Sequence, residues 1–244
     1  MERLLDEHLE KLKTRVLKMC SLVDEQVLFA IKAVEDDNLE LAQSVIERDK
    51  KVNKYDVKID KICQKIFALA QPVAMDLRYI MSSLTINSNL ERIGDIAVNI
   101  AENIVMIQKK PEFYPHTKLE EMFNLTKRML KNSIDAFIGG NPELAKEVIL
   151  TDDIVDNLNA ENHLILKSIM KQSPDNIEGA VALLVISREL ERLADHSTNI
   201  AEDVFFIVEA QLIKHKYEKY IFGDDENEND NDKATDDANE GLNS

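Results

Sequence analysis

Residues 91–102 read ERIGDIAVNIAE, and residues 191–202, one hundred positions later, read ERLADHSTNIAE. Glu, Arg, Asp, Asn, Ile, Ala and Glu recur at the same relative places in the two stretches. Any two amphipathic helices can share apolar residues at helical spacing, because that spacing only marks a buried face. Repeated polar residues of metal-ligand type are not explained in this way. The repeat therefore predicts that something is bound or docked once in each copy.

The duplication extends to the segment that precedes each motif. The pattern of Leu-Ala, Val-Ile, Asp and Val in residues 41–52 recurs in residues 144–155, at an offset of 103. Helical periodicity predicts three helices before a linker with two prolines at 109–116, at about 2–34, 38–70 and 73–108. A fourth helix should end at Gly139-Gly140, a fifth should begin at Asn141-Pro142, and a sixth should begin at Ser173-Pro174 and end near Lys219.

This pattern predicts an all-α fold of two tandem antiparallel three-helix bundles, with an internal repeat of about 100 residues. We expect the first bundle in residues 1–110 and the second in residues 116–219. Residues 223–244 contain nine acidic residues against a single lysine and almost no apolar residue, so we expect an acidic disordered tail.

The composition of the chain argues against several classes of function. The chain of 244 residues carries a formal net charge of −16, which argues against nucleic-acid binding because that binding depends on cationic contacts to phosphate. No apolar run approaches the roughly 20 residues that span a bilayer, and the charged N-terminus does not resemble a signal peptide. Cys20 and Cys63 lie at apolar positions of helical patterns, which indicates buried reduced thiols. We expect a cytoplasmic protein.

Two polar stripes should meet within each repeat. At 100° per residue, the acidic residues of the repeated motif and its asparagine, Asn99 or Asn199, share one side of their helix, opposite its isoleucines. Counted from Pro72, Asp49 and Asp95 are both 23 residues from the turn, so an antiparallel hairpin places them level. The second repeat has the same arrangement around Pro174. The candidate metal ligands are Glu91, Asp95, Glu191 and Asp195 of the motifs, with Asp49, Asp152 and Asp156 facing them.

Such carboxylates would repel one another without a counter-charge. Because neighbouring helices pack about 8–10 Å apart, Asp and Glu side chains from both helices can close on a cation. Oxygen-rich ligation with at most one histidine per site points to a hard or borderline cation such as iron, manganese or magnesium. Asn53 stands where the second repeat has Asp156, so the second site should bind metal more tightly. The alternative is a metal-free docking scaffold in which the stripes contact a partner.

The stretches 89–95 (NLERIGD) and 189–196 (ELERLADH) resemble the two signature motifs of the PhoU family of phosphate-transport regulators. The NIAE continuation of each motif and Asp76-Leu77-Arg78 are also similar to that family, and the resemblance covers about residues 1–217. It implies a cytoplasmic, non-enzymatic negative regulator of two three-helix bundles. Such a protein couples the ATPase of the phosphate ABC transporter to a phosphate-sensor histidine kinase and represses the phosphate-starvation response.

The resemblance also implies multinuclear iron or zinc clusters on the candidate ligands named above. We further expect a homodimer that meets the membrane only through its partners. The chain departs from the family pattern at Asn89, where aspartate is frequent, at Ala194, where glycine is frequent, and in its acidic tail.

Two catalytic or signalling alternatives fit the sequence poorly. A carboxylate-bridged di-metal enzyme would need Glu-x-x-His motifs, and none of the five histidines follows a glutamate by three positions. A histidine phosphotransfer module would need a suitably placed histidine, yet no histidine is duplicated between the repeats. His196, next to Asp195, reads better as a packing or hydrogen-bonding residue than as a metal ligand.

Overall fold

The helix boundaries follow from capping residues. Helix α2 (Leu39–Leu69) begins after Asn38, whose side chain accepts a hydrogen bond from the Leu41 backbone N–H at 2.9 Å. Helix α5 (Pro142–Met170) begins after Asn141, which caps two backbone N–H groups in the same way, and has proline at its first position. Helix α4 (Leu119–Gly139) ends at Gly140, which has a φ of 58° in the left-handed region that favours glycine.

The computed structural model describes residues 2–209 of the chain. Its other helices are α1 (Glu2–Glu35), α3 (Ala74–Ile107) and α6 (Ile177–Glu209), and single 3₁₀ turns lie at Tyr114–His116 (η1) and Pro174–Asn176 (η2). The Ser173-Pro174 pair therefore opens a short 3₁₀ turn rather than the sixth helix itself. The reason is local: the Ser173 hydroxyl accepts a hydrogen bond from the Asp175 backbone N–H and closes a tight turn before α6 begins. The predicted end near Lys219 and the tail at 223–244 lie outside the described residues.

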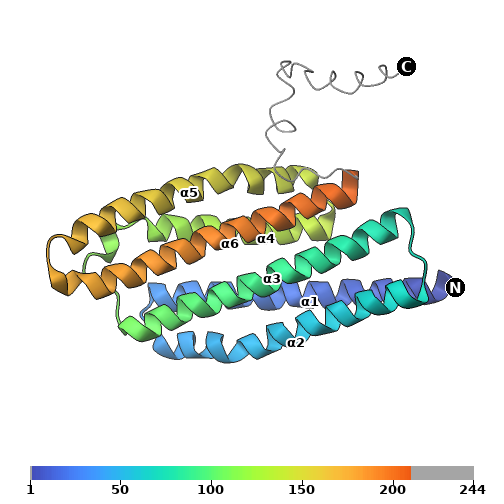
Figure 1. Cartoon of the computed structure of the whole chain (residues 1–244), viewed down its shortest axis with the longest axis horizontal. Coiled ribbons are helices and arrows are strands. Elements are labelled where there is room, and N and C mark those ends of the chain that lie inside the picture. The colour runs from blue at the N-terminus through green and yellow to red at the C-terminus, as the bar shows by residue number, and fades with distance from the viewer. Residues whose placement is uncertain (1, 210–244) are drawn as a thin grey trace, which may run out of the picture. The chain divides into compact units, whose positions relative to one another are not determined.

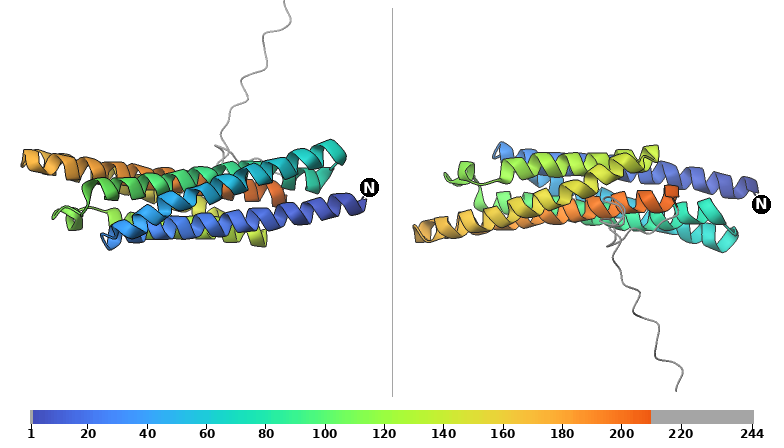
Figure 2. Two further views of the ribbon diagram at one scale, coloured as in Figure 1. Left: turned by 90° about the horizontal axis from the view of Figure 1, so that it is seen from below. Right: turned by 90° about the horizontal axis from the view of Figure 1, so that it is seen from above.

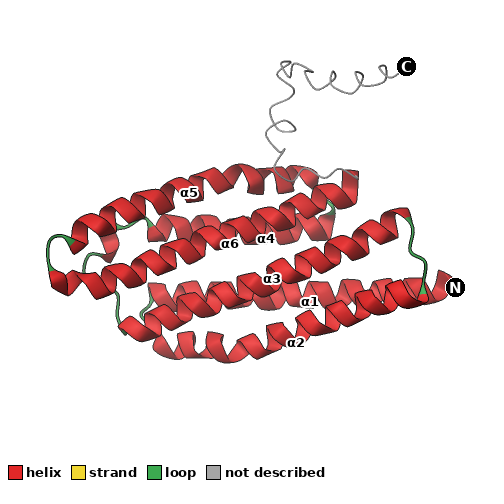
Figure 3. Ribbon diagram, in the orientation of Figure 1, coloured by secondary structure: helices red, strands yellow, loops and turns green. Residues whose placement is uncertain are grey.

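The six helices form two antiparallel bundles (Figures 1 and 2). Helices α1, α2 and α3 pack on one another, and α4, α5 and α6 do the same. The two bundles meet mainly where α3 lies beside α6, with a smaller contact between α1 and α4. Figure 3 shows only helices and loops over residues 2–209. The predicted all-α fold of two tandem three-helix bundles is therefore confirmed.

Each bundle has an apolar core to which the motif helix contributes one face. Ile93, Ile96, Ile100 and Ile104 of α3 are fully buried, as predicted from their position opposite the polar stripe. Burying such a side chain contributes about 1.5–3 kcal/mol relative to leaving it in water. The polar side of the motif is thus held in place by the packing of the opposite side.

The two cysteines are buried free thiols, which confirms their predicted state. Cys20 and Cys63 have exposed fractions of 2% and 0%. Burial disfavours the thiolate and raises the pKa of each thiol to about 12. Both residues therefore act as small core side chains.

None of the helices within residues 2–209 combines the length and hydropathy that crossing a bilayer requires.

Candidate functional site

The first carboxylate cluster lies between α2 and α3, where the two helices approach closely. A Cβ atom at Gly94 would lie 3.1 Å from Cγ1 of Val52, so the glycine permits this separation. Asp49 of α2 and Asp95 of α3 come close enough for Asp49 to raise the pKa of Asp95, after the larger effect of burial. Glu91 also has a raised pKa, first because of burial and then because of Asp95. The predicted meeting of these stripes is therefore present in the structure.

Neighbouring donors already compensate much of this first cluster. The Asn53 side-chain amide donates to Oδ2 of Asp49 at 2.6 Å, and Gln26 approaches Oδ1 of the same carboxylate at 3.5 Å. The Arg92 guanidinium lies 3.6 Å from a carboxylate oxygen of Glu91 and 3.6 Å from one of Asp95. The first cluster is therefore a hydrogen-bonded and partly neutralised set of acids.

The second cluster lies between α5 and α6 and contains Asp152, Asp156, Glu191 and Asp195. Burial raises the pKa of Asp152 to about 7, and the next largest contributions come from Asp195 and Asp156. Asp195 and Asp156 also raise the pKa of Glu191, after burial. The pKa of Asp195 itself is raised by burial and by Asp156. Asp156 and Asp195 therefore lie close enough to raise the pKa of both Asp152 and Glu191.

Among residues 2–209, the carboxylates of the second cluster lack the ion pairs that Arg92 makes in the first. Arg192 occupies the same motif position as Arg92, but its guanidinium binds both carboxylate oxygens of Glu189 at 3.0 Å. Oδ1 of Asp152 is buried, and the nearby Thr198 hydroxyl lowers the pKa of Asp152 less than burial and the two carboxylates raise it. Burial and the neighbouring carboxylates raise the pKa of Glu191 more than Arg188 and Arg192 lower it, and the pKa of Asp195 is raised more than Arg192 lowers it. The two clusters therefore share a position in the repeat and differ in charge balance.

The donor chemistry of the second cluster suits a cation, but its side chains are not arranged around one. Within residues 2–209, no three His, Cys, Asp or Glu side chains converge closely enough to hold a metal ion. Four carboxylates from two facing helices nevertheless supply the oxygen donors that hard cations prefer. A cation there would also remove the repulsion that raises the pKa of Asp152. The residues therefore fit a metal chemically, and binding it would require their side chains to rotate inward.

A third polar group joins the two repeats at the contact between α3 and α6. The Asn99 side chain donates to Glu189 at 3.2 Å, and the Asn199 side chain donates to Asn89 at 3.4 Å. Because each asparagine is 100 positions from its counterpart, as is Asn89 from Glu189, the two hydrogen bonds are equivalent under the repeat. Nδ1 of His196 lies 2.9 Å from Oδ1 of Asn89. His196 is therefore a hydrogen-bonding residue, as its sequence context indicated.

The sequence interpretation missed this junction. It placed Asn99 and Asn199 on the same stripe as the candidate metal ligands, whereas the structure directs both side chains to the other repeat. The signal was present in the asparagine that both motifs repeat, but a helical wheel does not show which of two neighbouring helices a side chain meets. Glu189 is buried at this junction. Counting residues from the turn could not predict its role, because that count compares only the two helices of one hairpin.

These features define a class of protein: a tandem-repeat helical protein with a carboxylate cluster in each repeat and a polar junction between the repeats. The sequence model of the PhoU domain matches residues 16–104 and 119–204. The chain belongs to the PhoU family. It is 38% identical over 211 residues to the phosphate-specific transport system accessory protein PhoU homolog of Aquifex aeolicus, covering 86% of this chain and 96% of that relative.

Solved structures of the family have the same fold. PhoU from Pseudomonas aeruginosa superposes with a TM-score of 0.81 at 32% identity, covering 84% of this chain and 99% of the other. The phosphate transport system regulatory protein PhoU from Streptococcus pneumoniae gives a TM-score of 0.75 at 27% identity, covering 85% and 98%. Both comparisons cover the two bundles together.

Proposed function

We propose that this protein is a cytoplasmic, non-enzymatic accessory protein of a phosphate transport system. In this role it couples the ATPase of a phosphate ABC transporter to a sensor histidine kinase and represses the phosphate-starvation response while phosphate is plentiful. The observation that carries the proposal is the 38% identity, over nearly the whole length of both chains, to a relative named as such an accessory protein. A protein with this role acts by binding, and we propose that it does so as a homodimer.

The carboxylate clusters are the candidate contact and switching surfaces. Each presents acidic side chains from two helices at the same position of its repeat, so one partner or one ligand type could be recognised twice. Glu91 and Glu191 are the motif glutamates of the two clusters, and both are partly exposed. A partner could therefore reach them without unfolding the bundle.

A genetic experiment tests the regulatory role. Deleting the gene should switch on a phosphate-starvation reporter in phosphate-replete cells. The Glu91→Ala, Glu191→Ala double variant should reproduce the deletion at normal protein abundance. The control is Glu47→Ala with Glu147→Ala, which removes the same charge from exposed positions of α2 and α5. Normal repression in the deletion strain would refute the role, and normal repression in the double variant alone would exclude the clusters as the contact.

A second candidate role, holding a cation, is favoured by the poorly compensated second cluster. We propose that Asp152, Asp156, Glu191 and Asp195 would hold the ion, which supplies positive charge that draws the α5 and α6 carboxylates together. Iron, zinc, manganese and magnesium are the candidate ions. Metal analysis of protein purified without chelator should find the ion, and Asp195→Asn should lower its content. If wild type and variant contain equally negligible metal, the clusters are metal-free docking surfaces.

A further inference from the structure

One face of the first bundle carries positive charge that the second bundle lacks. Lys51, Lys54, Lys58, Lys61 and Lys65 recur along α2, and at 100° per residue they fall within a wedge of about 80°. The carboxylates of α2 that meet α3 lie on a different side of the helix. Among residues 2–209, none of these five lysines forms an ion pair. We call this set the lysine face.

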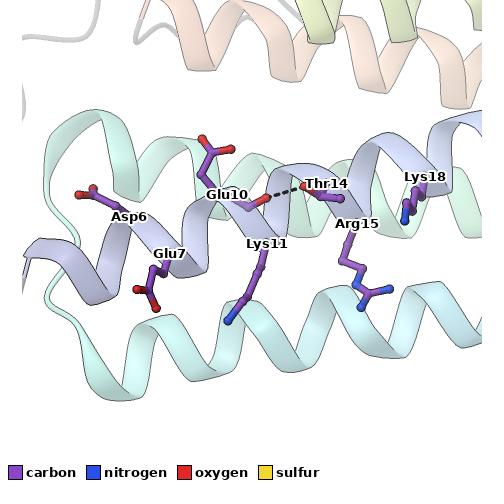
Figure 4. A pocket seen from close by; sticks show the side chains of 7 residues that line it. All are labelled: Asp6, Glu7, Glu10, Lys11, Thr14, Arg15 and Lys18. Carbon is purple, nitrogen blue, oxygen red and sulfur yellow. Dashed lines mark hydrogen bonds between the residues drawn. The ribbon is translucent and has the colours of Figure 1, made fainter.

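Helix α1 extends the lysine face across the groove between the two helices. Figure 4 shows Lys11 and Arg15 reaching from α1 toward α2, after the acidic residues of the first turns. The Arg15 guanidinium lies 5.8 Å from the centre of the Tyr55 ring, and the Lys58 ammonium lies 4.8 Å from it. Together with Lys18, three of the α2 lysines, Lys51, Lys54 and Lys58, line a hollow of about 520 Å³ around Tyr55. Cations of α1 and α2 therefore meet around Tyr55.

The second repeat does not carry this charge. At the offset of 103, the positions that match Lys51, Lys54, Lys58, Lys61 and Lys65 hold Ile154, Asn157, Glu161, Leu164 and Ser168. The fold and the carboxylate clusters are therefore maintained without a basic outer face. In a chain of net charge −16, such a concentration of unpaired lysines is not explained by general solubility.

Exposed apolar side chains continue the lysine face at the α2–α3 hairpin. Leu69, Val73 and Met75 have exposed fractions of 52%, 69% and 66%. Leu69 lies within the same wedge of α2 as the lysines, and Val57 is exposed beside them. Lysines beside exposed large apolar residues are typical of protein surfaces that adsorb to a bilayer. On such a surface the cations contact lipid phosphates and the apolar side chains enter the headgroup region.

We propose that the lysine face docks the first bundle on an anionic lipid surface, with the α2–α3 hairpin at the membrane. This contact goes beyond the proposed regulatory role, because it gives the protein a direct lipid contact in addition to contacts through partners. The second bundle, without the lysines, would face away from the bilayer. The negative charge of the rest of the chain would favour that orientation.

Flotation of the full chain with vesicles tests the proposal. The protein should bind phosphatidylcholine vesicles that contain about 30% phosphatidylglycerol and should not bind phosphatidylcholine alone. Raising the salt from about 0.1 M to about 1 M shortens the Debye length from about 10 Å to about 3 Å and should release most of it. Replacing Lys51, Lys54, Lys58 and Lys61 by Gln should weaken binding roughly tenfold or more.

Matched variants separate the lysine face from net charge. Replacing Lys131, Lys146, Lys167 and Lys171 of the second repeat by Gln removes the same charge and should leave vesicle binding unchanged. Changing Leu69, Val73 and Met75 to Ser should remove the binding that survives high salt, whereas the same change at Leu164, Ile177 and Val181 should not. Absent or lipid-independent binding, equal effects of the two lysine sets, or binding to soluble polyglutamate without binding to vesicles would each overturn the proposal.

Discussion

Asp152→Asn should stabilise the metal-free protein at alkaline pH. Burial and the neighbouring carboxylates raise the pKa of Asp152 from 3.8 to about 7 in the folded state. Because the folded pKa lies above the unfolded one, the folded state holds the proton more tightly. The stabilisation that comes from this more tightly held proton is fully present below about pH 4 and is lost as the pH rises through about 7. At pH 8 the ionised carboxylate therefore destabilises the fold, and a neutral amide avoids that cost.

The size of the effect follows from the same pKa. A tenfold change in proton affinity corresponds to about 1.4 kcal/mol, so the shift sets an upper limit of about 4 kcal/mol. Asp152 remains partly exposed, and solvent screening reduces the expected gain to about 1–2 kcal/mol. For a domain of this size, each kcal/mol moves the midpoint of thermal unfolding by about 2–4 °C. The variant should therefore melt roughly 2–8 °C higher at pH 8 and close to wild type at pH 4.

Thermal unfolding of chelator-treated protein, followed by circular dichroism at the two pH values, measures this difference. Glu147→Gln is the matched control, because it removes one charge from an exposed position of the same helix and should change the midpoint little. A variant that is no more stable than wild type at pH 8, or whose advantage is equal at both pH values, would refute the electrostatic reasoning. Where the second cluster holds a cation as proposed, added metal should reverse the order, because a ligand that binds only the folded state stabilises it.

Two other substitutions compare equivalent positions of the two repeats. Arg192→Ala should lower the free energy of unfolding by about 1–3 kcal/mol, because it leaves the buried Glu189 carboxylate with only the amide of Asn99. The matched Arg92→Ala removes exposed ion pairs and should cost no more than about 1 kcal/mol. Equal losses of the free energy of unfolding in urea would contradict the claim that Arg192 stabilises the junction through Glu189. Asn53→Asp should destabilise the metal-free protein by about 1 kcal/mol, because it replaces a hydrogen bond to Asp49 with repulsion. It should also raise the metal content of the first cluster, and unchanged metal content would argue against that cluster as a site.

The fold could be predicted because its determinants are local or repeated. Asn38, Asn141 and Gly140 each act on the backbone beside them, so a sequence reading places the helix ends within a residue or two. The repeat then supplies the tertiary arrangement, because two copies of one pattern adopt one packing. The start of α6 was misplaced because a serine cap followed by proline serves a 3₁₀ turn as well as an α-helix.

The candidate site was predicted only in part. The register within a hairpin follows from the sequence, whereas the partner that each side chain chooses depends on residues of other helices. Counting from Pro72 correctly brought Asp49 level with Asp95, since an antiparallel hairpin fixes that register. The same counting could not show that Arg92 turns toward its own cluster while Arg192 turns to the junction. That choice depends on the residue at position 89 or 189, which is asparagine in one repeat and glutamate in the other. The two repeats thus differ in the residue three positions before the motif arginine and in the carboxylates with which that arginine pairs.

The junction and the second cluster are therefore electrostatically linked. Because Arg192 engages Glu189, it forms no ion pair with Glu191 or Asp195 in the described part of the chain, although its charge still lowers the pKa of both carboxylates, whereas Arg92 lies 3.6 Å from Asp95. Glu189 in turn accepts a hydrogen bond from Asn99 of the first repeat. Arg192 thus lies between the second cluster and the contact between the repeats, whereas Arg92 has an asparagine, Asn89, three positions before it on its own helix.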